Sequence, residues 1–348
     1  MPRRAVTFVL SLLLLGALAV AGALADVPYV AESPGPTFNT LGSYQGTPLI
    51  QVKGHPVYRH DGGHLNLVTV SISGGPGHAL GLFTAISDWL DPHTAVVPEN
   101  EIFSPGTTQR QTEREAQLEM QQSQDAAVSA ALAQLGIKPT AIRIAGFVDG
   151  APSAKTLKVG DVIASVEDTK VTDLAQLTRL ISGNRKPGDT ITLGIRRGGK
   201  LMRVTVPLMA APGEPSRAIV GIYPQPVWPF TVDFHLEDVG GPSAGMMFAL
   251  GIIDLLTKGP LTGGTFVAGT GEISADGQVG AIGGIAQKMV GASRDGARYF
   301  LAPAANCADV RKADVPQGLD VVKVATLHDA LGAVRRIARG DAVGLPHC

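Results

Sequence analysis

The sequence predicts an α+β protein with two domains behind a single N-terminal helix. Its 348 residues are enough for two modest hydrophobic cores, because 45% of them are hydrophobic and only 17% are charged. Runs rich in β-branched residues alternate with segments of helix-forming residues, which is typical of a mixed fold. The formal net charge of −1 leaves no electrostatic case for a nucleic-acid partner.

Residues 1–26 predict a targeting helix. Arg3 and Arg4 precede an uncharged, mostly apolar run from Ala5 to Ala25, which is long enough to cross a bilayer. Ala23-Leu24-Ala25 resembles a signal-peptidase site, but the run exceeds the apolar part of a usual signal peptide, so we favour a retained anchor over a cleaved signal. The basic residues should stay in the cytoplasm. We therefore expect a single-pass cell-membrane protein with the rest of the chain extracytoplasmic, or a secreted protein if the helix is removed.

Residues 27–124 predict a linker followed by a strand and the start of a long helix. Glu32 to Pro48 is rich in Pro and Gly, as in a connecting segment. Leu65 to Ile72 has the β-branched content of a strand, and it runs into the turn Gly74-Gly75-Pro76-Gly77. Thr112 to Leu135 contains neither Pro nor Gly, which favours a helix.

Residues 125–211 predict a small β-rich module. We expect strands at Ala141–Val148, Gly160–Ile163, Thr190–Arg197 and Leu201–Leu208, with a hairpin turn at Gly198-Gly199 and a helix carrying Leu174, Leu177, Leu180 and Ile181. The segments Val148–Ala154 and Leu157–Ile163 resemble a PDZ domain. That resemblance implies a groove that holds an extended peptide by adding it to a sheet edge.

Ser243 is the candidate nucleophile in residues 212–348. It lies in Asp238–Gly245, which leads into the apolar, Pro-free segment Met246–Leu256, so the serine sits where a loop becomes a helix. Free backbone N–H groups and the positive end of the helix dipole would stabilise a negatively charged intermediate there. The alternative is that Ser243 only caps the helix.

Lys288 is the candidate base. The eight histidines show no context of a Ser-His-Asp triad, whereas Ile285, Met289 and Val290 would pack the helix that carries Lys288 against a core. A free lysine with a pKa of ~10.4 is protonated at neutral pH, and burial can lower that pKa by roughly 3–5 units. A solvated lysine on an amphipathic helix is the alternative.

Three linked motifs resemble the proteolytic domain of the Lon family, over about Val232 to Leu331. The motifs are Gly241-Pro242-Ser243-Ala244-Gly245, Thr270-Gly271-Glu272-Ile273 with Gly277-Gln278-Val279, and Ile282-Gly283-Gly284-Ile285 with Lys288. The resemblance implies that Ser243 attacks the peptide carbonyl, Lys288 takes its proton and Thr270 holds the lysine. It also implies that Gly241, Pro242 and Ala244 shape the nucleophile loop and the oxyanion site.

Two departures separate the sequence from ATP-dependent members of that family. The position three before the serine, often acidic there, is Gly240, so the role of that carboxylate is lost or moved to Asp238. No unfoldase sequence is present. Both features resemble bacterial membrane-anchored PDZ/Lon-type proteases, which implies an ATP-independent serine endopeptidase of the cell envelope. It would need no cofactor or metal and would act on unfolded or extended protein substrates, with residues 27–124 contributing to the catalytic fold and the PDZ-like module inserted in it or preceding it.

Three matters stay open at this point. A non-catalytic PDZ receptor or scaffold at the membrane is the alternative function, whereas a histidine-dependent envelope protease lacks its Gly-Asp-Ser-Gly-Gly motif. A homo-oligomer is compatible with the sequence, which does not fix the oligomeric state. Cys307 and Cys348, the only cysteines, either pair with each other or remain free thiols, and neither predicts catalysis or metal binding.

Overall fold

The computed structural model describes residues 3–60, 62–183, 185–237 and 239–348. The chain forms two compact units. The first unit combines Met1–Gln51, Pro56–Gln134 and Val232–Cys348, and the second combines Val52–His55 with Leu135–Thr231. The second unit is therefore inserted in the first: the chain passes through β5 (Ile50–Lys53), and it returns through β17 (Thr231–Phe234).

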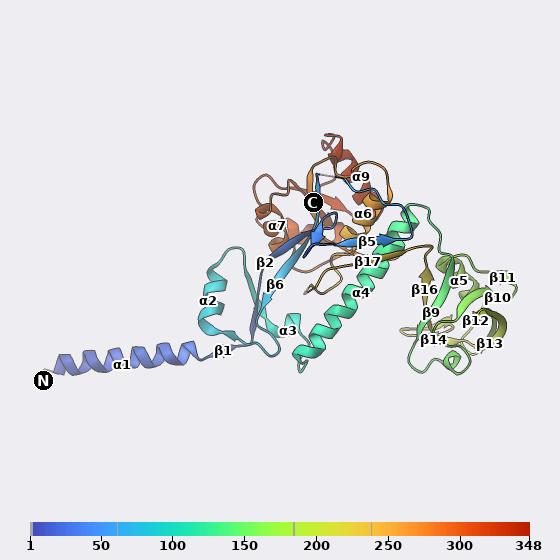
Figure 1. The fold of residues 1–348 in the computed structure, drawn as a ribbon. Helices are drawn as coiled ribbons and strands as arrows, with labels where there is room; N and C mark the ends of the chain where they lie inside the picture. Colours follow the sequence, from blue (N-terminus) through green and yellow to red (C-terminus); the bar gives the residue numbers. More distant parts are fainter. Residues whose placement is uncertain (1–2, 61, 184, 238) are drawn as a thin grey trace. The chain divides into compact units, whose positions relative to one another are not determined.

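A six-stranded sheet forms the centre of the first unit. Its order is β22-β21-β18-β6-β2-β8. The four strands β22, β21, β18 and β6 are parallel to one another. Next to them, β2 pairs antiparallel with β6, and β8 pairs antiparallel with β2. The strands are β22 (Asp320–Val324), β21 (Tyr299–Pro303), β18 (Phe266–Gly269), β6 (His64–Ser73), β2 (Tyr29–Asn39) and β8 (Ala95–Pro98). Segments before and after the insertion thus share one sheet (Figure 1).

The prediction of a linker from Glu32 to Pro48 is wrong over the first part of this range, because Tyr29–Asn39 is the strand β2. It pairs with β6 on one side and β8 on the other. Pro36 is tolerated because it lies where the register with β6 shifts, between Pro34 and Thr37, and a bulge leaves residues outside the hydrogen-bond ladder. Gly35 lies so close to β6 that a Cβ atom there would be 2.8 Å from the backbone carbon of Thr69.

Helices enclose this sheet. The helix α6 (Gly245–Leu256) is buried at every residue and contacts β6, α4 (Gln109–Gln134) and α9 (Leu327–Ala338). A helix that is apolar on all sides belongs in a core, so α6 is the central element of the unit. The helix α7 (Ile285–Arg294) packs on β2 and β6. The strand expected at Leu65–Ile72 and the helix expected at Thr112–Leu135 are confirmed as β6 and α4, and the α+β class with them.

The first unit has further elements outside its six-stranded sheet. They are α1 (Arg3–Ala23), β1 (Asp26–Val27), β3 (Ser43–Tyr44), β4 (Thr47–Pro48), β7 (Leu80–Gly81), α2 (Leu82–Leu90), α3 (Glu99–Ile102), β19 (Glu272–Ile273), β20 (Val279–Gly280) and α8 (Cys307–Val310). Within the described residues, one helix is long and apolar enough to cross a membrane, at Val6–Ala23. Cys307 and Cys348 form a disulfide, which decides between the two alternatives for these residues.

The second unit is a small sheet covered by a helix. Its strand order is β13-β12-β10-β9-β16, with β11 paired to β10. Leu177 and Ile181 of α5 are buried in its core with Ile142 and Ile163 from the sheet. The bounds are β9 (Ala141–Phe147), β10 (Val162–Val166), β11 (Thr169–Lys170), α5 (Leu174–Ser182), β12 (Thr190–Arg197), β13 (Lys200–Pro207), β14 (Met209–Ala211), β15 (Glu214–Ile219) and β16 (Ile222–Val227). The hairpin expected at Gly198-Gly199 is confirmed, because β12 and β13 pair across it.

Candidate active site

The loop that carries Ser243 is held against α4. The backbone N–H of Gly241 donates to the carbonyl of Ala116 at 3.0 Å, and the Ser123 hydroxyl donates to the carbonyl of Pro242 at 2.8 Å. The two glycines make this approach feasible: a Cβ atom at Gly240 would be 2.6 Å from that of Ala116, and Gly241 has a φ of +84°, which favours glycine. Asp238 lies outside the described residues.

Ser243 precedes the buried helix α6 without capping it. The N-cap residue is Ala244, whose side chain makes no capping hydrogen bond. The Ser243 hydroxyl and the backbone N–H groups of Ser243 and Ala244 make no hydrogen bond among the described residues. These groups are therefore available to a ligand at the positive end of the helix dipole.

Lys288 is buried, with 4% of its surface exposed. Burial is the main reason that its pKa falls from 10.5 to about 8, whereas the nearby carboxylates of Glu32 and Glu272 oppose the change. A lysine in this range is partly neutral at physiological pH and can accept a proton. The solvated-lysine alternative does not describe this side chain.

Thr270 connects the lysine to the serine loop. Its side chain is fully buried at the end of β18. Its hydroxyl donates to the carbonyl of Ser243 at 3.0 Å and accepts from Nζ of Lys288 at 3.3 Å. The N–H of Gly271 also donates to the Ser243 carbonyl, at 2.8 Å. The three residues that the motifs select, far apart in sequence, thus lie in one connected group.

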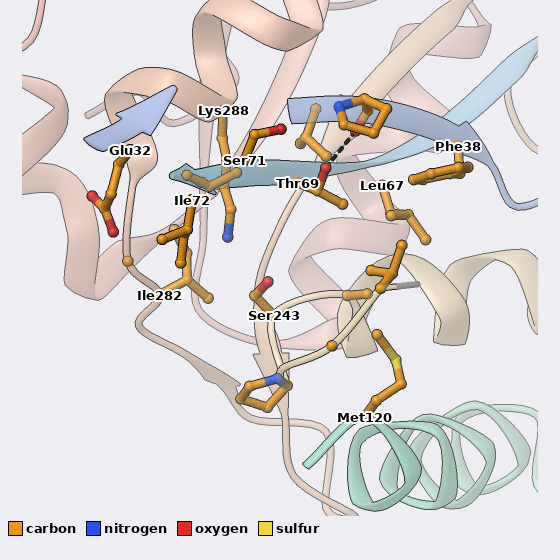
Figure 2. Close-up of a pocket in the computed structure, with 18 of the residues that line it drawn as sticks. Glu32, Phe38, Leu67, Thr69, Ser71, Ile72, Met120, Ser243, Ile282 and Lys288 are labelled. Atoms are coloured by element: carbon orange, nitrogen blue, oxygen red, sulfur yellow. Dashed lines mark hydrogen bonds between the residues drawn. The ribbon is translucent and has the colours of Figure 1, made fainter. Parts of the chain in front are cut away.

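Ser243 and Lys288 line one cavity of about 670 Å³. In the close-up of this cavity, the Lys288 amine points toward the Ser243 hydroxyl (Figure 2). The remaining walls are mixed: Phe38, Leu67, Ile72, Met120 and Ile282 are apolar, whereas Glu32, Glu237 and Glu272 carry carboxylates. A space of this size beside a nucleophile and a base can take the side chains of an extended peptide. No cluster of three or more His, Cys, Asp or Glu suited to a metal ion occurs among the described residues.

The carboxylate of Glu32 is a part of this site that the motifs do not reveal. It lies on β2, lines the cavity and has a raised pKa because burial disfavours its charge, which the positive charge of Lys288 partly offsets. Glu272 belongs to the Thr-Gly-Glu motif, but its influence on Lys288 follows only from the fold. Glu32 could have been considered if its segment had been predicted as a strand. The neighbouring prolines disfavour that prediction, because they are uncommon inside strands.

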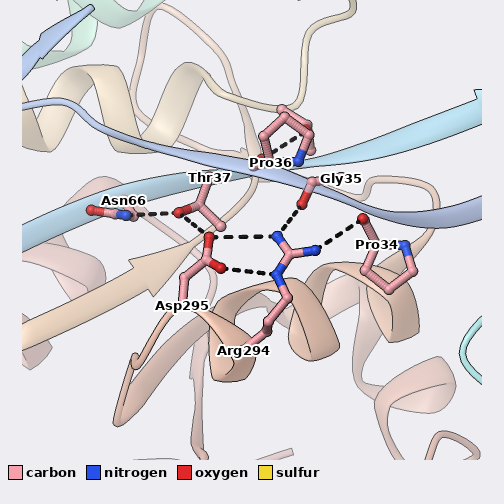
Figure 3. A network of polar contacts seen from close by, with 8 residues as sticks. Pro34, Gly35, Pro36, Thr37, Asn66, Arg294 and Asp295 are labelled. Atoms are coloured by element: carbon pink, nitrogen blue, oxygen red, sulfur yellow. Dashed lines mark hydrogen bonds and ion pairs between the residues drawn. The ribbon is translucent and has the colours of Figure 1, made fainter.

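A polar network fixes α7, the helix of Lys288, against β2. The Arg294 guanidinium donates to the carbonyl of Gly35 at 2.9 Å and to the carboxylate of Asp295 at 2.9 Å (Figure 3). Thr37 donates to the same carboxylate at 2.9 Å and accepts from Asn66 of β6 at 2.8 Å. The end of α7 is therefore tied to both strands that border the cavity.

Comparison with known proteins assigns both parts of the chain. Residues 237–335 match the model of the Lon protease (S16) C-terminal proteolytic domain, and residues 117–208 match the PDZ domain model. The chain contains a Lon-type proteolytic domain and a PDZ domain. The Lon-type match covers Ser243, Thr270 and Lys288, and the PDZ match begins within α4 and ends after β13.

Relatives of the Lon-type domain share it as part of much longer proteins. A Lon protease of Phenylobacterium zucineum is 32% identical over 169 residues, which are 46% of this chain and 21% of that protein. The peroxisomal Lon protease homolog 2 of Caenorhabditis elegans is 38% identical over 96 residues, 27% of this chain and 12% of that protein. The chain thus spans about a fifth or less of the length of these relatives. Among solved structures, the PDZ domain of an SdrC-like protein from Listeria monocytogenes is 21% identical, with a TM-score of 0.22, over 24% of this chain and 85% of that one.

Proposed function

We propose that the chain is a serine endopeptidase with a Ser243/Lys288 dyad. The observation that carries this proposal is the buried Lys288 amine, held by Thr270 in the cavity that Ser243 lines. With a pKa of about 8, about a tenth of the amine is neutral at pH 7. That fraction is far larger than for a solvated lysine, so the amine can act as a general base.

The proposed reaction uses these groups in turn. Neutral Lys288 takes the hydroxyl proton as Ser243 Oγ attacks the peptide carbonyl, and the N–H groups of Ser243 and Ala244 stabilise the resulting oxyanion. The lysine then protonates the departing amine, which leaves an acyl group on Ser243. Water, activated by the same lysine, hydrolyses this ester and restores the serine.

The substrates in this proposal are extended protein segments. The cavity offers both apolar and polar walls to substrate side chains, and a folded domain could not thread its chain past Ser243. The PDZ domain would hold a further stretch of the same or another peptide by β-addition. We propose that turnover needs no ATP. We also propose that α1 anchors the chain in the cell membrane, with both domains outside the cytoplasm.

The decisive experiment compares turnover of a denatured protein, without ATP, by wild type, Ser243→Ala and Lys288→Ala. We expect both variants to lose activity by a factor of at least ~10³. Ser87→Ala and Lys258→Ala are matched controls in the same unit, since both residues are exposed and lie outside the cavity, and they should keep wild-type activity. Activity that survives in Ser243→Ala would exclude this mechanism. A wild type that binds peptide but never cleaves it would favour the scaffold alternative.

A further inference from the structure

The helix α2 presents large apolar side chains to solvent. Phe83, Ile86, Trp89 and Leu90 are 52%, 46%, 72% and 70% exposed, and Ala85 is the only buried residue of α2. Their spacing of three and four residues places them along one side of the helix. We call these four residues the α2 apolar face. A continuous apolar surface of this kind on a soluble domain marks an interaction site.

This face adjoins the end of the apolar helix α1. Asp26 pairs with Gly81 and Val27 with Leu80, and the Leu82 N–H donates to the carbonyl of Ala25 at 2.9 Å. A Cβ atom at Gly22 would be 3.0 Å from Cζ of Phe83, so the ring lies directly on the α1 backbone. The start of α2 is therefore fixed to the last turn of α1.

The direction of α2 suits a membrane surface. Figure 1 shows that α2 lies across the end of α1 and does not continue it. If α1 crosses a bilayer through Val6–Ala23, its last turn lies at the boundary between hydrocarbon and headgroups. A helix that runs across that end lies along the boundary, where Trp and Phe side chains are favoured.

We propose that the α2 apolar face inserts into the lipid interface of the membrane that α1 spans. This inference rests on the proposed anchoring by α1. Lipid is the occupant that the structure favours, because the face is continuous with the span through Gly22 and Phe83. Asp88 and Asp91 give this segment a negative charge, so binding depends on apolar burial, and neutral lipids suffice. A second contact beside α1 would restrict how the Lon-type domain tilts at the membrane.

The test places the full chain in nanodiscs of phosphatidylcholine with nitroxide-labelled lipids. The sequence has only two tryptophans, Trp89 and Trp228, so Trp228→Phe leaves Trp89 as the single fluorophore. We expect a nitroxide near the headgroup to quench at least about half of the Trp89 fluorescence, and iodide in the water to quench little. The control is Val343→Trp in a chain in which Trp89 and Trp228 are both replaced by Phe. Val343 is 87% exposed in the first unit, so the fluorescence of a tryptophan at this position should be quenched by iodide and not by the lipid nitroxide.

Each outcome decides the inference. Lipid quenching of Trp89 above that of the control supports it, whereas equal quenching in an incorporated chain overturns it and leaves the anchor intact. A chain that does not incorporate at all overturns both the anchor and this inference. Proteolysis is separable: Phe83→Ser with Trp89→Ser should keep wild-type turnover of a soluble denatured substrate, because neither residue lines the cavity.

Discussion

Nζ of Lys288 lies 3.3 Å from Oγ1 of Thr270. A threonine hydroxyl has one hydrogen, and here it is given to the Ser243 carbonyl, so the oxygen can only accept from the lysine. This contact fixes the direction of the amine while its pKa is lowered by burial. The threonine therefore positions the proposed base and does not itself meet a substrate.

Replacing Thr270 should separate this positioning from simple packing. Thr270→Val keeps the shape but removes both hydrogen bonds, and we expect kcat to fall by about 10–100-fold because the amine loses its fixed direction. Thr270→Ser keeps the hydroxyl and should recover most of the rate. Steady-state kinetics on one peptide substrate measures both variants. Equal rates for Thr270→Val and wild type would show that the contact is not needed.

The pH profile should report the pKa of Lys288. The base form is required, so kcat/KM should rise about tenfold per pH unit below the pKa and become level above it; with a pKa of about 8, the bend should lie near there. Glu32→Gln removes a negative charge that raises this pKa, so the bend should move to lower pH. Glu101→Gln, at an exposed residue outside the cavity, should leave it unchanged. A bend that stays in place in Glu32→Gln would contradict the proposed coupling.

The same burial should make Lys288 costly for stability. Its pKa falls from 10.5 to about 8 on folding, and one unit corresponds to about 1.4 kcal/mol, so the cost is about 3 kcal/mol below pH 8. The unfolded chain binds more protons between pH 8 and 10.5, hence this cost shrinks as pH rises through that window. We expect Lys288→Met to raise the free energy of unfolding at pH 7, with a smaller gain at pH 9.5.

Denaturant unfolding at the two pH values checks this prediction. Lys258→Met, at an exposed position, is the control and should change stability little at either pH. A loss of stability in Lys288→Met at pH 7 would mean that the amine is better solvated than its burial indicates.

The motifs predict Ser243, Thr270 and Lys288 because each sits in a short segment whose residues also shape the local backbone. Gly240 and Gly241 allow the approach to α4, and the apolar run after Ser243 becomes the buried α6. Such local patterns can be seen in a sequence. The geometry that joins the three residues then follows from β18 and α7 packing in one unit.

Glu32 could not be predicted from the sequence, because its role depends on pairing between distant segments. The prolines of β2 remove the alternation that marks a strand, and Pro36 fits the sheet because it lies in the bulge opposite β6. The Cys307–Cys348 bond is a similar case, since the two cysteines alone gave no reason to prefer pairing over free thiols. The position of Glu32 and the disulfide both depend on contacts between distant segments, and neither produces a local pattern in the sequence.

Arg294 should matter for the site although it lies outside the cavity. Arg294→Ala removes the bond to the Gly35 carbonyl and leaves Asp295 without its guanidinium partner. The end of α7 then keeps the bond from Thr37 to Asp295 but loses the guanidinium contacts to β2. The Asp295 carboxyl, whose pKa is lowered chiefly by its hydrogen bond from Arg294, would also be more easily protonated. We expect Tm to fall by about 2–4 °C and kcat to fall several-fold, because Lys288 is carried by the same helix.

Arg298→Ala is the matched control, since Arg298 is exposed just after the same helix and should change neither quantity. Arg294→Lys keeps the charge but cannot reach a carbonyl and a carboxylate with one planar group, so it should restore Tm only in part. If Arg294→Ala lowers Tm while kcat stays at the wild-type value, the network stabilises the fold without positioning the lysine. If kcat falls in Arg294→Ala and is partly recovered in Arg294→Lys, the attachment of α7 to β2 sets the geometry of the proposed dyad.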